Sequence, residues 1–94
     1  MNILTQIIED RYDEEFLKAD GFDDAVIGMC YNSSRLIYCY TKCKQILIDE
    51  GMDEVDAIEH LSFNVMGAYV GEKTPIWCMD NYELKMIVNY GNYN

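Results

Sequence analysis

Apolar side chains recur with a helical period near the N-terminus. Between residues 5 and 19, Ile8, Tyr12 and Phe16 stand four residues apart, which places them on one face of an α-helix. Thr5 is a residue type that caps a helix start, because its hydroxyl can accept a hydrogen bond from a first-turn N–H. The pattern predicts a helix over 5–19, and the carboxylates within it make the helix acidic.

Two β-rich runs follow, at residues 25–31 and 35–40. The residues between them, Asn32-Ser33-Ser34, favour a turn, so the pair predicts an antiparallel hairpin. Gly28 lies inside the first run. A strand glycine indicates either a β-bulge or close packing of another element over it, and we favour a helix packed over it.

The pattern then returns to a helical period in two successive segments. Residues 42–50 and 54–65 are predicted to form an αα-hairpin, with Thr41 and Asp53 as N-caps and Gly51 ending the first helix. We expect the second helix to bury one stripe of side chains: Val55, Ile58, Leu61, Ser62 and Val65.

A third strand is predicted at residues 76–79. Asp80 followed by Glu83 resembles a capping box, and residues 81–91 fit either a final helix or a strand. The element order predicts an α+β fold in one domain, residues 1–94. A small antiparallel sheet, made of the hairpin plus one strand, would pack with the αα-hairpin and the acidic N-terminal helix.

Charge changes this picture, because the chain is strongly acidic. Seven basic residues against seventeen acidic ones give a net charge of −10, which argues against direct nucleic-acid binding. The carboxylates cluster at 9–24 and 49–59. Such clusters are typical of a solvated surface, but they also suit contact with a basic protein. Candidate partner-binding residues are Asp10, Asp13, Glu14, Asp53, Glu54 and Asp56.

The other composition features favour a cytoplasmic protein without a cofactor. No apolar run approaches the ~20 residues that span a bilayer, and the N-terminus lacks the features of a signal peptide. We therefore expect no membrane contact and four reduced cysteines buried as small hydrophobes. Cys39 and Cys43 have a C-x3-C spacing, but no further ligands complete a metal set, so none is predicted.

The second predicted helix of the hairpin carries a polar row that could do chemistry. Asp56, His60 and Asn64 are four residues apart, and an acidic neighbour could hold one tautomer of the histidine. The row suits a general base or a ligand-holding stripe. It also suits an ordinary solvent-facing stripe, which we favour because no nucleophile accompanies it. No catalytic residue is therefore predicted.

Residues 63–75 read as neither plain core nor plain surface. Gly67 and Gly71 punctuate the segment, and it is not a phosphate-binding loop because no Gly-Lys-Ser/Thr follows. Asn64 stands near the end of the predicted helix, where a short amide often bonds the backbone of the next loop. We expect Asn64 to fix the loop 69–74 in this way.

The same segment carries a resemblance. Phe63-Asn64-x-x-Gly67-Ala68-Tyr69-x-Gly71-Glu72-x-Thr74-Pro75 is similar to a motif in small proteins encoded by tailed phages, and the similarity extends over about residues 22–79. The resemblance implies a phage protein made in the cytoplasm of a bacterial host. It carries over no catalytic residue.

These patterns favour a non-enzymatic host-takeover or anti-defence factor that binds and inhibits a host protein, possibly a nucleic-acid-binding one. A small-ligand protein, such as one that sequesters a nucleotide, is the alternative, and a small hydrolase using Asp56, His60 and Glu72 is a third hypothesis. A homodimer stays open. Candidate residues of the loop or ligand surface are His60, Asn64, Tyr69, Glu72, Thr74 and Trp77.

Overall fold

The computed structural model describes residues 2–82. Three α-helices and a three-stranded sheet in this part of the chain confirm the predicted α+β class. Most of the helix or strand predicted at 81–91 lies outside the described residues. The elements are α1 (Ile3–Asp10), β1 (Val26–Met29), β2 (Leu36–Cys39), α2 (Tyr40–Asp49), α3 (Glu54–His60) and β3 (Ile76–Cys78). A short 3₁₀ turn, Asp23–Ala25, precedes β1, and a π-helical turn, Leu61–Val65, continues α3.

Helix α1 is much shorter than the predicted helix over 5–19. It ends at Asp10, and its cap is Asn2, whose side-chain oxygen accepts a hydrogen bond from the Thr5 N–H at 2.8 Å. The predicted apolar stripe is wrong, because Tyr12 is 86% exposed and Leu4 is the buried residue of the helix. The acidic residues after Asp10 weaken the helical pattern, and residues 11–22 continue as turn and extended chain.

The antiparallel hairpin of β1 and β2 is confirmed. Its register shifts between Val26 and Gly28, so Gly28 belongs to a β-bulge. A Cβ at Gly28 would meet no atom within 4 Å, so the expected close packing over this glycine is wrong.

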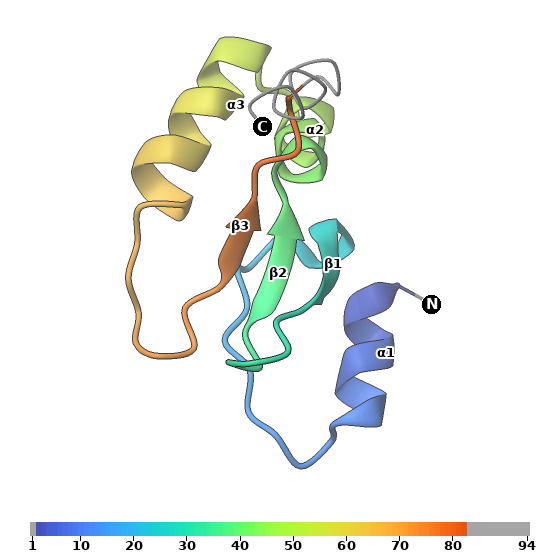
Figure 1. Cartoon of the computed structure of the whole chain (residues 1–94). Coiled ribbons are helices and arrows are strands. Elements are labelled where there is room, and N and C mark those ends of the chain that lie inside the picture. Colours follow the sequence, from blue (N-terminus) through green and yellow to red (C-terminus); the bar gives the residue numbers. More distant parts are fainter. Residues whose placement is uncertain (1, 83–94) are drawn as a thin grey trace, which may run out of the picture.

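Strand β3 runs parallel to β2, which corrects the prediction of an all-antiparallel sheet. Ile76, Trp77 and Cys78 pair with Ile37, Tyr38 and Cys39, in the sheet order β1-β2-β3. Parallel neighbours need a crossover connection of a dozen or more residues. The two helices α2 and α3, with the loop 66–75, provide it, as Figure 1 shows.

The αα-hairpin is confirmed, with one cap of a different origin. Gly51, at φ +111°, follows the end of α2, and the Asp53 carboxylate accepts a hydrogen bond from the Asp56 N–H at 2.8 Å. Thr41 lies inside α2 rather than at its cap. The first-turn N–H of Thr41 donates instead to Asp80, which follows β3, at 3.0 Å.

The core is formed by the sheet, the three helices and the segment 22–25. Its largest fully buried side chains are Tyr38, Leu36, Leu61, Val26 and Cys43. The predicted buried stripe of α3 is only partly correct. Ala57 and Leu61 are buried, whereas Val55 is 63% and Ile58 is 36% exposed, because the face that packs against α2 is rotated from the expected one.

Within residues 2–82, no helix has the length and apolar character needed to cross a membrane.

Candidate functional site

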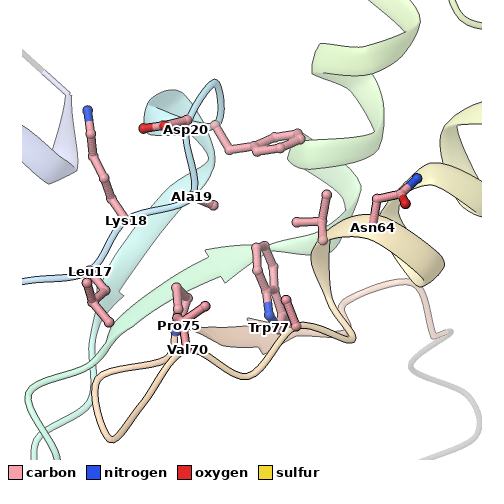
Figure 2. Close-up of a pocket in the computed structure, with 11 residues that line it drawn as sticks. Leu17, Lys18, Ala19, Asp20, Asn64, Val70, Pro75 and Trp77 are labelled. Carbon is pink, nitrogen blue, oxygen red and sulfur yellow. The ribbon is translucent and has the colours of Figure 1, made fainter.

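A hollow of about 390 Å³ opens beside Trp77, between two segments that are distant in sequence. We call it the Trp77 hollow. Residues 17–22 form one wall, and residues 64–77 form the other, as Figure 2 shows. Its lining residues are Leu17, Lys18, Ala19, Asp20, Phe22, Asn64, Val65, Ala68, Val70, Pro75 and Trp77. The lining is mostly apolar with a few polar groups, which is the usual character of a binding pocket.

Trp77 packs against the core through Tyr38. Its ring lies 5.0 Å from that of the fully buried Tyr38, its partner on β2. The Tyr38 hydroxyl accepts a hydrogen bond from the Ala19 N–H at 2.8 Å, which ties the first wall to the sheet. Burial raises the pKa of Tyr38, so the phenol stays neutral. One buried tyrosine therefore positions both the indole and the opposite wall.

The other wall is fixed by Thr74, not by Asn64 as predicted. The Thr74 hydroxyl accepts from the Val70 N–H at 2.9 Å and donates to the Gly71 carbonyl at 2.6 Å. Gly71 has φ +120°, a backbone conformation that favours glycine. Thr74 therefore closes a tight turn over residues 70–74.

The β1–β2 turn also supports this loop. Arg35 donates through Nε to the Thr74 carbonyl and through a second nitrogen to the Pro75 carbonyl at 3.5 Å. Lys73 Nζ donates to the Ser33 carbonyl at 3.2 Å. Two cationic side chains are thus engaged with backbone oxygens rather than with the hollow.

The predicted polar row on α3 is only partly assembled. The Asn64 amide lies 3.3 Å from His60 Nδ1, and Asn64 is exposed rather than bonded to the loop. It lacks the predicted role because the helix carries it to the surface, although its side chain lines the edge of the Trp77 hollow. Glu72 lies on the loop after Gly71, whereas His60 is the last residue of α3.

A second hollow adjoins the first. We call it the Glu72 hollow; it measures about 580 Å³ and is lined by Glu15, Phe16, Leu17, Val70, Gly71, Glu72 and Lys73. Leu17 and Val70 line both hollows, so they form a shared wall. The two hollows are therefore direct neighbours, and we call the pair the cleft: its first half is lined mostly by apolar side chains, and its second half carries Glu15 and Glu72 together with Lys73.

Large apolar side chains lie exposed along the chain beside this cleft. Phe63 is 80%, Tyr69 is 77% and Val70 is 60% exposed. Single exposed apolar residues are ordinary, but several on a segment that also lines a hollow are typical of an interaction surface. We call residues 63–70 the exposed apolar segment.

The predicted ligand-surface residues are divided between these features. Asn64 and Trp77 line the Trp77 hollow, and Glu72 lines the other one. His60, Tyr69 and Thr74 line neither. The sequence interpretation missed the wall at 17–22, because it assigned residues 17–19 to a helix.

The acidic candidates form two separate groups. Asp10, Asp13 and Glu14 lie at and just after the end of α1, whereas Asp53, Glu54 and Asp56 lie at the start of α3. Figure 1 shows these two places at opposite ends of the molecule. Each group contains one residue of a surface salt bridge: Glu14 pairs with Arg11, and Glu54 pairs with Lys44, both at 3.3 Å. The clusters therefore do not merge into one acidic face.

The four cysteines are free thiols, but only Cys39 and Cys43 are buried as predicted. Burial raises the pKa of Cys43 to about 12. Cys39 donates to Asp80 at 2.9 Å, and burial together with this bond raises its pKa. Cys30 and Cys78 are half-buried. The Ser33 hydroxyl and neighbouring backbone N–H groups lower the pKa of Cys30.

Among residues 2–82, no three His, Cys, Asp or Glu side chains are arranged to hold a metal ion. Comparison with known proteins found no matching family model, no matching curated protein and no matching solved structure.

Proposed function

We propose that the chain is a non-enzymatic protein-binding module whose contact face is the Trp77 hollow together with the exposed apolar segment. The observation that carries this proposal is the exposure of Phe63, Tyr69 and Val70 on the segment that also forms a wall of an apolar hollow. Interfaces concentrate aromatic anchors around pockets that a partner's side chain can fill. The face therefore has the composition that a protein contact needs.

The partner we propose is a basic protein of the bacterial host. A net charge of −10 attracts positively charged surfaces over a distance and raises the rate of encounter. The resemblance to tailed-phage proteins supports a role in host takeover or anti-defence, in the host cytoplasm. A nucleic-acid-binding host protein has the required charge.

A small-ligand protein is the second candidate, and the size of the Trp77 hollow favours it. A volume of about 390 Å³ lies within the range of ligand pockets, and an indole ring can stack on a planar ligand. A nucleotide suits the hollow poorly. Lys18, on its wall, is paired with Asp23 at 3.2 Å, and Asp20 adds negative charge. A ligand-induced rise in melting temperature would support this candidate.

Site-specific photo-crosslinking tests the proposed contact face. A benzophenone amino acid replaces Tyr69 in one variant and Tyr12, which is 86% exposed beyond the end of α1, in a matched control. Each variant is irradiated in host lysate after expression. We expect one host protein to crosslink at position 69 and not at position 12. Crosslinking of that protein at position 12 alone would contradict the proposal.

A further inference from the structure

We infer that the cleft binds an extended peptide segment in which a large apolar side chain and a basic side chain stand two residues apart. This inference rests on the proposed function and goes further, since it specifies the chemistry of the bound segment. The apolar side chain would occupy the Trp77 hollow, and the basic one would occupy the Glu72 hollow.

The first step is the contrast between the two halves of the cleft. The Trp77 hollow presents the indole, Phe22 and Pro75, which suit an apolar side chain. The Glu72 hollow presents the carboxylates of Glu15 and Glu72. Each half therefore recognises a different kind of side chain.

The charge of Glu15 and Glu72 is complementary to that of a basic side chain. Within the described part of the chain, neither Glu15 nor Glu72 takes part in an ion pair. Lys73 also lines this hollow, but its ammonium group donates to the Ser33 carbonyl in the β1–β2 turn. The two carboxylates are thus available to a cation from a partner.

The third step is spacing. Leu17 and Val70 line both hollows, so the two subsites are direct neighbours. In an extended peptide, residues two apart project from the same face and are separated by roughly 6.6 Å, twice the rise per residue. One extended segment can therefore place an apolar and a basic side chain on either side of the shared wall.

Three short peptides test the inference against the full-length protein. They are acetyl-Gly-Phe-Gly-Arg-Gly-amide, the same peptide with Glu in place of Arg, and the same peptide with Ala in place of Phe. Trp77 is the only tryptophan, so its indole N–H gives a single, unambiguous NMR signal to follow during titration. We expect the Phe–Arg peptide to bind roughly five-fold more tightly than either control peptide, which is about the most that one exposed ion pair contributes to affinity.

Charge variants then separate the acidic subsite from the net charge of the protein. In Glu15→Lys/Glu72→Lys we expect the preference to reverse, so that the Phe–Glu peptide binds more tightly than the Phe–Arg peptide. The matched control, Asp56→Lys/Glu59→Lys, changes the net charge equally on α3 and should keep the original preference. The preference should also shrink near 1 M salt, where the screening length falls to about 3 Å.

Equal binding of the Phe–Arg and Phe–Glu peptides, or a preference that survives in Glu15→Lys/Glu72→Lys, would overturn the inference. The Trp77 hollow would then bind apolar groups without an acidic subsite beside it, and the proposed function would stand. A Trp77 signal that shifts with protein concentration alone would assign the cleft to a second copy of the chain and also overturn the inference. If no peptide shifts the signal, the inference fails, and crosslinking at position 69 decides the proposed function separately.

Discussion

The two ends of the short strand β3 differ in how their polar and apolar groups are used. At its C-terminal end, Asp80 accepts hydrogen bonds from the Cys39 thiol, the Thr41 N–H and the Thr41 hydroxyl, which fastens the strand to the start of α2. At its N-terminal end, Pro75 and Trp77 line an open hollow. The first region, the Asp80 junction, stabilises the fold, whereas the second leaves apolar surface for a partner.

This contrast predicts that mutations can change the stability of the fold and its binding to a partner separately, even around a strand of three residues. Groups that are satisfied inside the protein contribute to folding free energy. Apolar side chains that remain exposed contribute to binding only when a partner covers them.

The largest expected effect is on the rates at which the individual cysteine thiols react at pH 8. At pH 8, a thiol with a pKa of about 12 is ionised in about one molecule in ten thousand, and only the thiolate reacts. Cys43 should therefore react orders of magnitude more slowly than Cys30, whose pKa is lowered and which is half-buried. Cys39, whose pKa is raised, should also react more slowly than Cys30. Mass spectrometry of a partial iodoacetamide reaction gives the order of modification.

The control for this experiment is denatured protein, in which all four thiols should react alike. Modification of Cys39 before Cys30 in native protein would show that the Asp80 junction opens easily. It would contradict the assignment of that junction to the rigid part of the fold.

Tyr38→Phe should lower the free energy of unfolding by roughly 1–3 kcal/mol, the cost of leaving a buried donor unpaired. The variant removes the acceptor for the Ala19 N–H but keeps the aromatic contact with Trp77. Urea denaturation measures the change. Tyr12→Phe, at an exposed site, is the matched control and should change the free energy by less than about 0.5 kcal/mol. Equal effects of the two variants would show that the hydrogen bond does not hold the wall at 17–22.

Asp80→Ala should cost roughly 0.5–2 kcal/mol, because α2 loses a side chain that caps its first turn. The loss should depend on pH in a defined direction. Hydrogen bonding from Cys39 holds the pKa of Asp80 below its usual range, so its stabilising effect is present above the unfolded value of about 3.9. It disappears as pH falls through the lower, folded value.

Denaturation of Asp80→Ala and wild type from pH 7 to pH 2 checks this behaviour. The difference in unfolding free energy should narrow as pH falls below about 4. A difference that stays constant to pH 2 would show that the carboxylate charge plays no part in the Asp80 junction.

The smallest expected effect is that of surface charge on stability. Asp13→Lys/Glu14→Lys should change the unfolding free energy by less than about 1 kcal/mol, since exposed ion pairs contribute little. It should nevertheless slow association with a basic partner, because these residues are next in sequence to Glu15, which lines the Glu72 hollow. Asp56→Lys/Glu59→Lys, on α3, should slow it less. Stopped-flow kinetics across a salt series separates these effects, and equal slowing by both variants would indicate net charge alone.

Local patterns were enough to predict the α+β class, the hairpin and the helix pair. Each depends on neighbouring residues: the turn at 32–34, Gly51 after α2 and Asp53 before α3. The direction of β3 could not be predicted in this way, because it depends on how the α2–α3 crossover returns the chain. The end of α1 was missed because the spacing of Ile8, Tyr12 and Phe16 imitates a buried stripe.

The candidate site was harder to predict for the same reason. Trp77, Asn64 and Glu72 were named from the segment that contains them, and the structure places them on the cleft. Leu17 and Phe22 form the opposite wall through a hydrogen bond between residues 19 and 38, a contact that no local pattern announces. The Thr74 hydroxyl closes its own loop, whereas the sequence was equally compatible with a hydroxyl that binds a ligand.

The most direct test of the separation between fold and contact face compares two variants against the partner identified by crosslinking at position 69. Val70→Ser changes an exposed wall of the cleft, and Asp80→Asn changes the junction with α2. By isothermal titration calorimetry, Val70→Ser should weaken binding about ten-fold, the loss expected when one apolar side chain is no longer covered, with an unchanged melting temperature. Asp80→Asn should lower the melting temperature and keep the affinity. The opposite pattern, with affinity lost in Asp80→Asn and kept in Val70→Ser, would contradict the account.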